Sequence, residues 1–119
     1  MKRLRVGVVG LGMGREHIKS YRTHPQAEVI AIAEPNVERR DTVGNEFDIK
    51  ARYESIDAML ADNELDVVSI VTPNKFHKAM TIQALEAGCH VLCEKPMAMS
   101  VAESREMLEV SRRTGKRLM

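Results

Sequence analysis

The sequence predicts an α/β protein: a doubly wound parallel sheet in a single domain that spans residues 1–119. Three observations lead to this fold class. Short apolar runs alternate with segments of helical periodicity along the whole chain. Glycines close the first apolar run and lead directly into a helical segment, as at a strand-to-helix turn. The chain has 119 residues, of which 44% are hydrophobic, which suffices for one domain with its own core.

The first half of the chain should contain three strands and three helices. The strands are expected at 4–10, 29–33 and, as a short edge strand, 51–53; the helices are expected at 14 to about 25, 36–47 and 55–60. The first strand is a continuous β-branched apolar run, which is typical of a strand buried on both faces. Gly14, Ile18 and Tyr21 lie on one face of the first helix. Asn36 and Ser55 are residue types that cap helices, and each precedes a helical segment.

The second half should contain two more strands, at 66–71 and 90–93, and two helices, at about 75–87 and 100–115. Pro73 ends the first of these strands, and Gly88 occupies the usual position after a helix C-terminus. Ser100 and Glu103 have the spacing of a capping box. Residues 116–119 should begin a sixth strand, so we expect the chain to be cut at a domain boundary or within its last strand.

Composition and charge exclude several classes of protein. The net charge is +1, from 18 basic and 17 acidic residues, and only four residues are Phe or Tyr, so no nucleic-acid partner is expected. The longest uncharged apolar stretch, 6–14, is too short for a membrane span, and no signal-peptide cleavage pattern follows the N-terminus. We therefore expect a cytoplasmic protein. Cys89 and Cys93 should be buried and reduced, and no ligand spacing suggests a metal site.

A glycine-rich segment, Gly10-Leu11-Gly12-Met13-Gly14, follows the first strand and leads into the first helix. The tight turn requires a residue without a Cβ, and a pyrophosphate can approach backbone amides closely only where side chains are absent. The helix N-terminus offers free N–H groups and a partial positive charge to the same phosphates. The segment is therefore predicted to bind the pyrophosphate of a dinucleotide.

An acidic residue, Glu34, ends the second strand, 24 residues after Gly10. A carboxylate at about this interval accepts hydrogen bonds from the ribose hydroxyls of adenosine. It repels a 2′-phosphate, so the sequence predicts NAD as the cofactor, with NADP less favoured. Arg39 and Arg40 could weaken this preference, but charge patterning favours a solvated helix face for both.

The glycine spacing leaves a second interpretation open. The dinucleotide fingerprint is G-x-G-x-x-G, whereas this chain has G-x-G-x-G. Methyltransferases that bind S-adenosylmethionine also use the shorter spacing with an acidic residue after the second strand. Two features oppose that class. Val8 stands where these enzymes usually carry an acidic residue, and Thr72-Pro73-Asn74-Lys75 stands where they have an Asn/Asp-Pro-Pro-aromatic motif.

Two later segments give a more specific signal. Residues 72–77 contain the pattern T-P-N-x-x-H, and residues 87–96 contain A-G-x-H-V-x-x-E-K-P. Together with the glycine segment and its trailing His17, they resemble the Gfo/Idh/MocA family of oxidoreductases, which includes glucose–fructose oxidoreductase and inositol dehydrogenase. The resemblance covers essentially the whole chain, but only the N-terminal domain of that family, which has an NAD(P)-binding Rossmann fold.

The resemblance implies which residues hold the cofactor. The glycine segment would meet the pyrophosphate and adenosine, and Glu34 would take the ribose. The nicotinamide half would be lined by Thr72, Pro73, Asn74 and His77. His17, in contrast, is interpreted as a helix residue satisfied within the protein rather than as a ligand contact.

Glu94, Lys95 and Pro96 match the E-K-P motif of the same family. In that family the lysine lies beside the substrate hydroxyl, and the Lys–Pro bond is often cis. A lysine cation there can stabilise a developing alkoxide, so Lys95 is the candidate catalytic residue. The Asp and His that complete the proton relay belong to a second domain, which holds the substrate and is expected to be absent from this chain.

These observations predict the NAD-binding domain of an enzyme that oxidises or reduces a hydroxyl of a sugar, an inositol or a related polyol. The chain alone should bind cofactor with little turnover, because substrate binding needs the second domain. The surface that this domain would cover could lead to self-association. A non-catalytic dinucleotide sensor or subunit stays open as a third interpretation.

Overall fold

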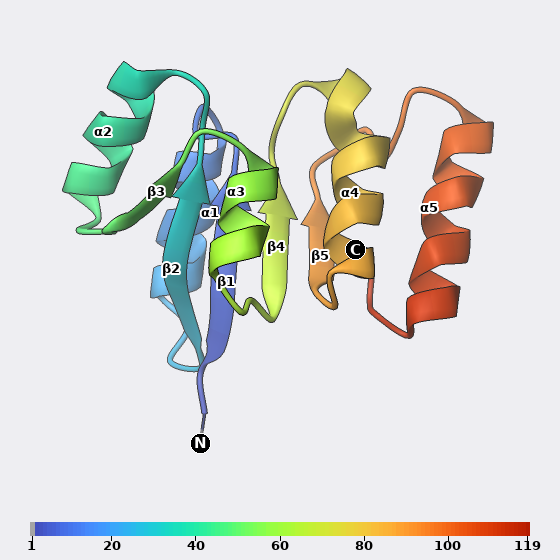
Figure 1. Cartoon of the computed structure of the whole chain (residues 1–119), viewed down its shortest axis with the longest axis horizontal. Coiled ribbons are helices and arrows are strands. Elements are labelled where there is room, and N and C mark those ends of the chain that lie inside the picture. The colour runs from blue at the N-terminus through green and yellow to red at the C-terminus, as the bar shows by residue number, and fades with distance from the viewer. Residues whose placement is uncertain (1) are drawn as a thin grey trace.

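A computed structural model of the chain describes residues 2–119, within which five strands form one parallel sheet in the order β3-β2-β1-β4-β5 (Figure 1). The strands are β1 (Leu4–Val9), β2 (Ala27–Ala33), β3 (Ala51–Tyr53), β4 (Val67–Ile70) and β5 (His90–Cys93). The helices are α1 (Gly14–Arg22), α2 (Val37–Glu46), α3 (Ile56–Asp62), α4 (His77–Glu86) and α5 (Val101–Thr114), with a short 3-10 helix η1 (Asn74–Phe76) before α4. The predicted doubly wound α/β fold is confirmed.

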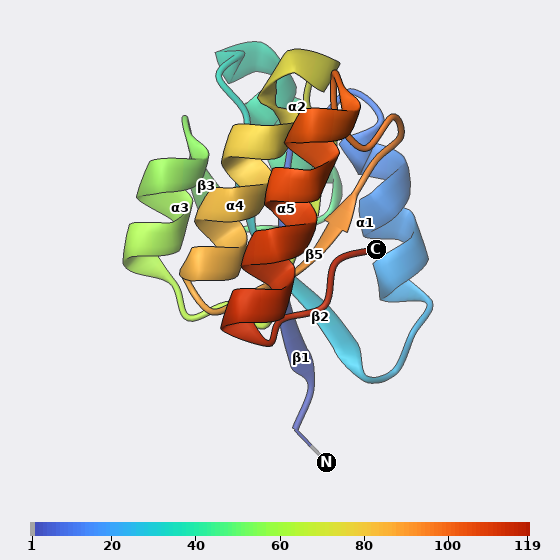
Figure 2. The same cartoon turned by 90° about the vertical axis from the view of Figure 1, so that its right-hand side faces the viewer.

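Helices cover both faces of the sheet because successive strand residues point to opposite faces. On one face, Val6 and Val8 of β1 pack in a core that includes Ile18 of α1. On the other face, the core includes Met59 of α3 and Leu85 of α4. In Figure 2, α3, α4 and α5 lie on one side of the sheet and α1 lies on the other. The central strand β1 is thus buried on both faces, as its continuous apolar run predicts.

Three helix starts follow the capping signals in the sequence. Asn36, Ser55 and Ser100 each accept a hydrogen bond from the backbone amide three residues further on, at 2.9, 3.2 and 3.2 Å. The capping box at α5 departs from its usual form. The Glu103 carboxylate accepts from the amide of Met99 at 3.1 Å, one residue before the cap, so the box closes one position earlier than expected.

Several element boundaries differ from the prediction by one to three residues, and two of these differences have a clear structural reason. Strand β2 begins at Ala27, because its first residues pair with the start of β1. Helix α4 begins at His77, because the chain first forms the η1 turn after Pro73. The two predicted helix C-termini are confirmed, since Gly88 and Gly115 follow α4 and α5 with φ of +90° and +71°.

The last residues lie alongside β5, as predicted for the start of a sixth strand. Leu118 forms a parallel bridge with Val91, and the Cys93 amide donates to the Met119 carbonyl at 2.8 Å. None of the helices within residues 2–119 is long and apolar enough to cross a membrane.

Candidate functional site

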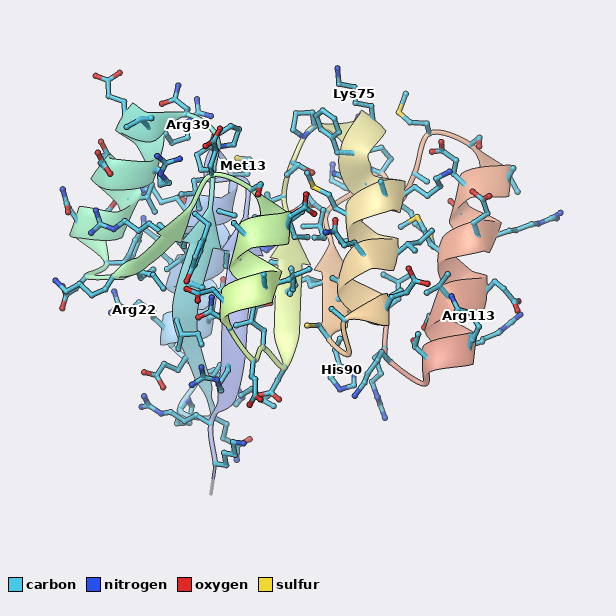
Figure 3. The ribbon with its side chains drawn as sticks, viewed as in Figure 1. Met13, Arg22, Arg39, Lys75, His90 and Arg113 are labelled. Atoms are coloured by element: carbon cyan, nitrogen blue, oxygen red, sulfur yellow. The ribbon has the colours of Figure 1, made fainter. Side chains whose placement is uncertain are left out.

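The candidate site lies at the carboxyl ends of the strands, where the chain switches between the two directions of winding. From β1 the sheet grows through β2 and β3 on one side and through β4 and β5 on the other. Open α/β sheets bind ligands at this switch point. Figure 3 shows Met13, Arg39 and Lys75 at this end of the sheet, whereas Arg22 and His90 lie towards the opposite end.

A cavity of about 820 Å³ opens at this point, which is large enough for a substantial part of a dinucleotide. Six of the residues predicted to bind cofactor line it: Gly10, Leu11, Gly12, Glu34, Thr72 and Pro73. The others, Met13, Gly14, Asn74, His77, Glu94, Lys95 and Pro96, surround the same end of the sheet without lining this cavity. The role of all thirteen residues in cofactor binding stays a prediction.

The glycine segment meets three different spatial demands. Gly10 has φ +89°, and a Cβ there would lie 2.5 Å from the Val71 carbonyl oxygen of the neighbouring strand end. At Gly12, a Cβ would meet nothing within 4 Å, so the backbone faces open space. At Gly14, a Cβ would lie 3.1 Å from a Val8 methyl group, which reflects close packing of α1 on β1. The shortened spacing therefore keeps the tight turn at the first glycine and the close helix packing at the third, and it leaves open space at the second.

Helix α1 begins without a side-chain cap. Its N-cap residue is Met13, which makes no capping hydrogen bond and is 64% exposed. The first backbone amides of the helix are therefore not satisfied by a cap, and they carry the partial positive charge of the helix N-terminus. This arrangement suits a phosphate group next to Gly12.

The carboxylate of Glu34 is fixed by the backbone around it and is only 5% exposed. Oε1 accepts from the Leu11 amide at 2.9 Å, and Oε2 accepts from the Asn36 amide at 3.0 Å. The first bond ties the glycine segment to the end of β2. Each oxygen keeps a lone pair for a further donor, such as a ribose hydroxyl reached through the cavity that Glu34 lines.

Arg39 and Arg40 are not merely a solvated helix face. The guanidinium of Arg39 lies 3.6 Å from Glu34 Oε1 and borders the cavity, and Arg40 donates to the Glu34 carbonyl oxygen at 2.8 Å. Helix α2 starts directly after β2, so its first turn faces back towards Glu34. A cation therefore stands beside the carboxylate that is expected to exclude a 2′-phosphate.

His77 is buried, with 1% exposed, and both ring nitrogens contact carbonyl oxygens. Nε2 lies 2.8 Å from the Thr72 oxygen, and Nδ1 lies 2.7 Å from the Pro96 oxygen. The ring thus joins the segment after β4 to the segment after β5. The hydroxyl of Thr72 donates to the sulfur of Met80 at 3.5 Å.

The E-K-P residues follow β5 at the same edge of the sheet. The Lys95–Pro96 peptide bond is cis, as the family resemblance implies. Glu94 Oε2 lies 2.8 Å from His17 Nε2, and Glu94 Oε1 accepts from the Lys95 amide at 3.1 Å. The hydrogen bond with His17 holds the pKa of Glu94 below its usual value. His17 is satisfied within the protein, as expected.

One wall of the cavity was not anticipated from the sequence. It is formed by Ser55 and Asp57 at the start of α3 and by Phe76, Met80 and Gln83 of η1 and α4. Both helices begin at the carboxyl edge of the sheet and cover the same face. Hydrophobic periodicity does not give the order of the strands in the sheet. Knowledge of that order would have placed these residues beside the glycine segment.

The two cysteines take no part in the cavity. Both are free; Cys89 is buried, whereas Cys93 is only partly buried because it ends a strand near the edge of the sheet. Burial raises the pKa of both thiols, so both stay protonated at neutral pH. The expected burial is therefore confirmed for Cys89 and only in part for Cys93.

Comparisons with known proteins agree with the fold. The model of the oxidoreductase family with an NAD-binding Rossmann fold, Gfo/Idh/MocA, matches residues 4–119. D-glucoside 3-dehydrogenase of Escherichia coli (strain K12) is 37% identical over 115 residues, which are 95% of this chain and 33% of that protein. Inositol 2-dehydrogenase of Salmonella typhimurium is 30% identical over 119 residues, 98% of this chain and 35% of that protein.

A solved structure of an oxidoreductase has the same fold as this chain. An oxidoreductase from Agrobacterium radiobacter, in complex with NAD⁺, L-tartaric acid and magnesium, superposes with a TM-score of 0.95 at 26% identity. The match covers 99% of this chain and 35% of that one. The chain thus spans about a third of the length of the proteins that it matches. These relatives favour the oxidoreductase interpretation over a methyltransferase.

Proposed function

The chain belongs to the Gfo/Idh/MocA oxidoreductase family with an NAD-binding Rossmann fold, and we propose that it is the domain that binds NAD for hydride transfer at a hydroxyl-bearing carbon. The observation that carries this proposal is the joining of the glycine segment to Glu34 at the switch point of the sheet. The bond from the Leu11 amide to Glu34 holds the segment proposed to bind the pyrophosphate beside the residue proposed to bind the ribose, and both line one cavity.

The residues fit the two ends of the cofactor. The open space at Gly12 and the uncapped start of α1 would receive the pyrophosphate. Glu34 would accept the adenosine ribose hydroxyls. Thr72 and Pro73, which line the cavity at the end of β4, would lead towards the nicotinamide half, with Asn74 following in η1.

Lys95 would act at the reacting end. The bound nicotinamide supplies hydride transfer to or from a carbon that bears a hydroxyl. The Lys95 ammonium would lie beside that hydroxyl oxygen and stabilise the negative charge that grows there as the proton leaves. Within residues 2–119, no hydrogen bond or ion pair holds this ammonium group, so it is available to a ligand.

The substrate and the complete reaction are proposals for a longer protein. Sugar and inositol dehydrogenases among the relatives support a polyol or sugar substrate, bound with a second domain beyond the region matched here.

We also propose that chains of this length self-associate through the exposed apolar side chains of Met97, Met99, Val101 and Leu108, which border a groove of about 410 Å³. Sedimentation that stays monomeric up to millimolar concentration would contradict that association.

Calorimetric titration with NAD⁺, NADP⁺ and S-adenosylmethionine tests the proposed function. We expect NAD⁺ to bind more tightly than NADP⁺ and S-adenosylmethionine to give no heat. Glu34→Gln removes the carboxylate charge and should raise the affinity for NADP⁺ relative to NAD⁺. Glu28→Gln, at an exposed position near the other end of the same strand, is the matched control and should change neither. Tight binding of S-adenosylmethionine without NAD⁺ binding would refute the proposal.

A non-catalytic dinucleotide sensor differs from an enzyme in its need for Lys95. In the full-length protein, Lys95→Met should abolish oxidoreductase turnover while cofactor binding persists. An unchanged biological function in that variant would favour the sensor.

A further inference from the structure

The two neighbours of Lys95 are each held by a histidine from a different helix. On one side, His17 of α1 contacts the carboxylate of Glu94, with 2.8 Å between Nε2 and Oε2. On the other side, His77 at the start of α4 contacts the carbonyl oxygen of Pro96, at 2.7 Å from Nδ1. Because α1 and α4 cover opposite faces of the sheet, the two contacts reach the segment from opposite directions (Figure 2).

The contact from His77 is built into the core. The ring is almost completely buried, and its second nitrogen, Nε2, contacts the Thr72 carbonyl oxygen at 2.8 Å. A carbonyl oxygen only accepts hydrogen bonds, so the ring nitrogen that carries the proton donates to the carbonyl it contacts. A buried ring that bridges two backbone segments cannot rotate without leaving polar groups unpaired. His77 therefore fixes the position of Pro96 relative to the end of β4.

The ring of His17 is held by a contact with the sheet, on the face opposite to α4. His17 Nδ1 lies 3.3 Å from the hydroxyl of Ser69, a fully buried residue of β4, and that hydroxyl lies 2.7 Å from the Tyr21 hydroxyl. Burial raises the pKa of Tyr21, so its hydroxyl stays protonated and available as a donor to this chain of contacts. The ring of His17 is thus oriented by the sheet before it meets Glu94. The same carboxylate accepts from the Lys95 amide, which passes the constraint to the backbone of Lys95.

We propose that His17 and His77 are positioning residues that clamp the backbone on both sides of Lys95 and leave only its side chain free. The proposal rests on the proposed function, in which Lys95 acts at the nicotinamide end of the site. A segment that is already ordered loses less conformational freedom when a ligand binds. Loss of either contact should therefore weaken binding of the nicotinamide end by about two- to tenfold without affecting the adenosine end.

Substitution of each histidine by asparagine or by glutamine tests the contacts of its two ring nitrogens one at a time. The asparagine amide nitrogen lies two bonds from Cβ, like Nδ1, and the glutamine amide nitrogen lies three bonds from Cβ, like Nε2. His17→Gln should keep the contact with Glu94, whereas His17→Asn should lose it. At His77 the order reverses, because Nδ1 makes the contact with Pro96: His77→Asn should keep that contact and His77→Gln should lose it.

The primary measurement is ¹⁵N relaxation of the backbone amides of Glu94, Lys95 and Met97 in the ligand-free chain. We expect order parameters of about 0.85 in wild type, His17→Gln and His77→Asn, and of about 0.6 or lower in His17→Asn and His77→Gln. His24→Gln, in the turn after α1, is the control and should change none of these amides. Equal order parameters in all variants, or equal loss in both members of a pair, would overturn the clamp. Should the buried His77 variants fail to fold, the His17 pair decides.

A second readout compares NADH with ADP-ribose, which lacks the nicotinamide. Variants that lose a clamp contact should bind NADH two- to tenfold more weakly and bind ADP-ribose as wild type does. Equal weakening of both ligands would indicate a general loss of structure and would contradict the proposal. If wild type binds neither ligand, the proposed function fails, and the relaxation data still decide whether the clamp exists.

Discussion

The first two glycines of the loop should respond in opposite ways to the same substitution, alanine. At Gly10, the new Cβ would lie 2.5 Å from the Val71 carbonyl oxygen, in a backbone conformation with φ +89° that side chains rarely adopt. At Gly12, φ is not positive and a Cβ would meet no protein atom within 4 Å. Gly10→Ala should therefore reduce the stability of the fold, whereas Gly12→Ala should reduce the affinity for the cofactor.

The magnitudes follow from these distances. A strained backbone position costs about 1–3 kcal/mol, and forcing an atom into packed backbone adds about 1–3 kcal/mol. Gly10→Ala should therefore lower the free energy of unfolding by about 2–6 kcal/mol and the Tm by about 10 °C or more. Gly12→Ala should leave stability within about 0.5 kcal/mol of wild type. It should weaken NAD⁺ binding by about 10- to 100-fold, because the pyrophosphate loses a charge-assisted hydrogen bond from the backbone.

Thermal unfolding and calorimetric titration of both variants measure the two effects. A Gly10→Ala variant with the Tm of wild type would refute the close approach of the β1 end to the β4 end. A Gly12→Ala variant that is stable and binds NAD⁺ as wild type does would refute the placement of the pyrophosphate.

Other perturbations probe single contacts. The hydrogen bond with His17 lowers the pKa of Glu94 in the folded state relative to the unfolded state. The ionised Glu94 carboxylate therefore stabilises the fold fully at a pH above the pKa of Glu94 in the unfolded chain, and this stabilisation is lost as the pH falls through the pKa of Glu94 in the folded chain. The Tm difference between wild type and Glu94→Gln should accordingly narrow from about pH 6 to about pH 3, and a difference that does not vary with pH would argue against the contact. Burial raises the pKa of the Cys89 and Cys93 thiols, so both should react with iodoacetamide at about pH 8 far more slowly in the folded chain than in urea; equal rates would show that they are accessible. Ser100→Ala removes the N-cap of α5 and should lower the free energy of unfolding by about 1 kcal/mol in urea titrations, and no change would mean that the cap contributes nothing.

Local signals in the sequence were sufficient for most of the fold. The continuous apolar run of β1 predicts burial on both faces, and this strand lies at the centre of the sheet. The caps at Asn36, Ser55 and Ser100 act within one turn of their own helices, so residue type and spacing identify them. The start of α4 was misplaced because a 3-10 turn and an α-helix share the same local preferences after Pro73.

The candidate site was predictable where a local sequence pattern marks its residues. The glycine loop and Glu34 are both marked by their positions at strand ends, and the structure brings them within hydrogen-bond distance. The partners of His77 and His17 were not predictable in this way. Their contacts, Pro96 and Glu94, lie 19 and 77 residues further along the chain and meet only through the strand order. Such pairs require the three-dimensional arrangement.

Mapping of NAD⁺ on the folded chain by ¹H–¹⁵N chemical shifts tests the central claim most directly. We expect the largest changes at the backbone amides of 10–14, Glu34 and 72–77, with smaller changes at 94–97. These residues lie at the carboxyl end of the sheet and come together only in the predicted topology. Changes confined to the opposite end, around the turn from Arg22 to Glu28, or no changes at saturating NAD⁺, would contradict the proposed dinucleotide site.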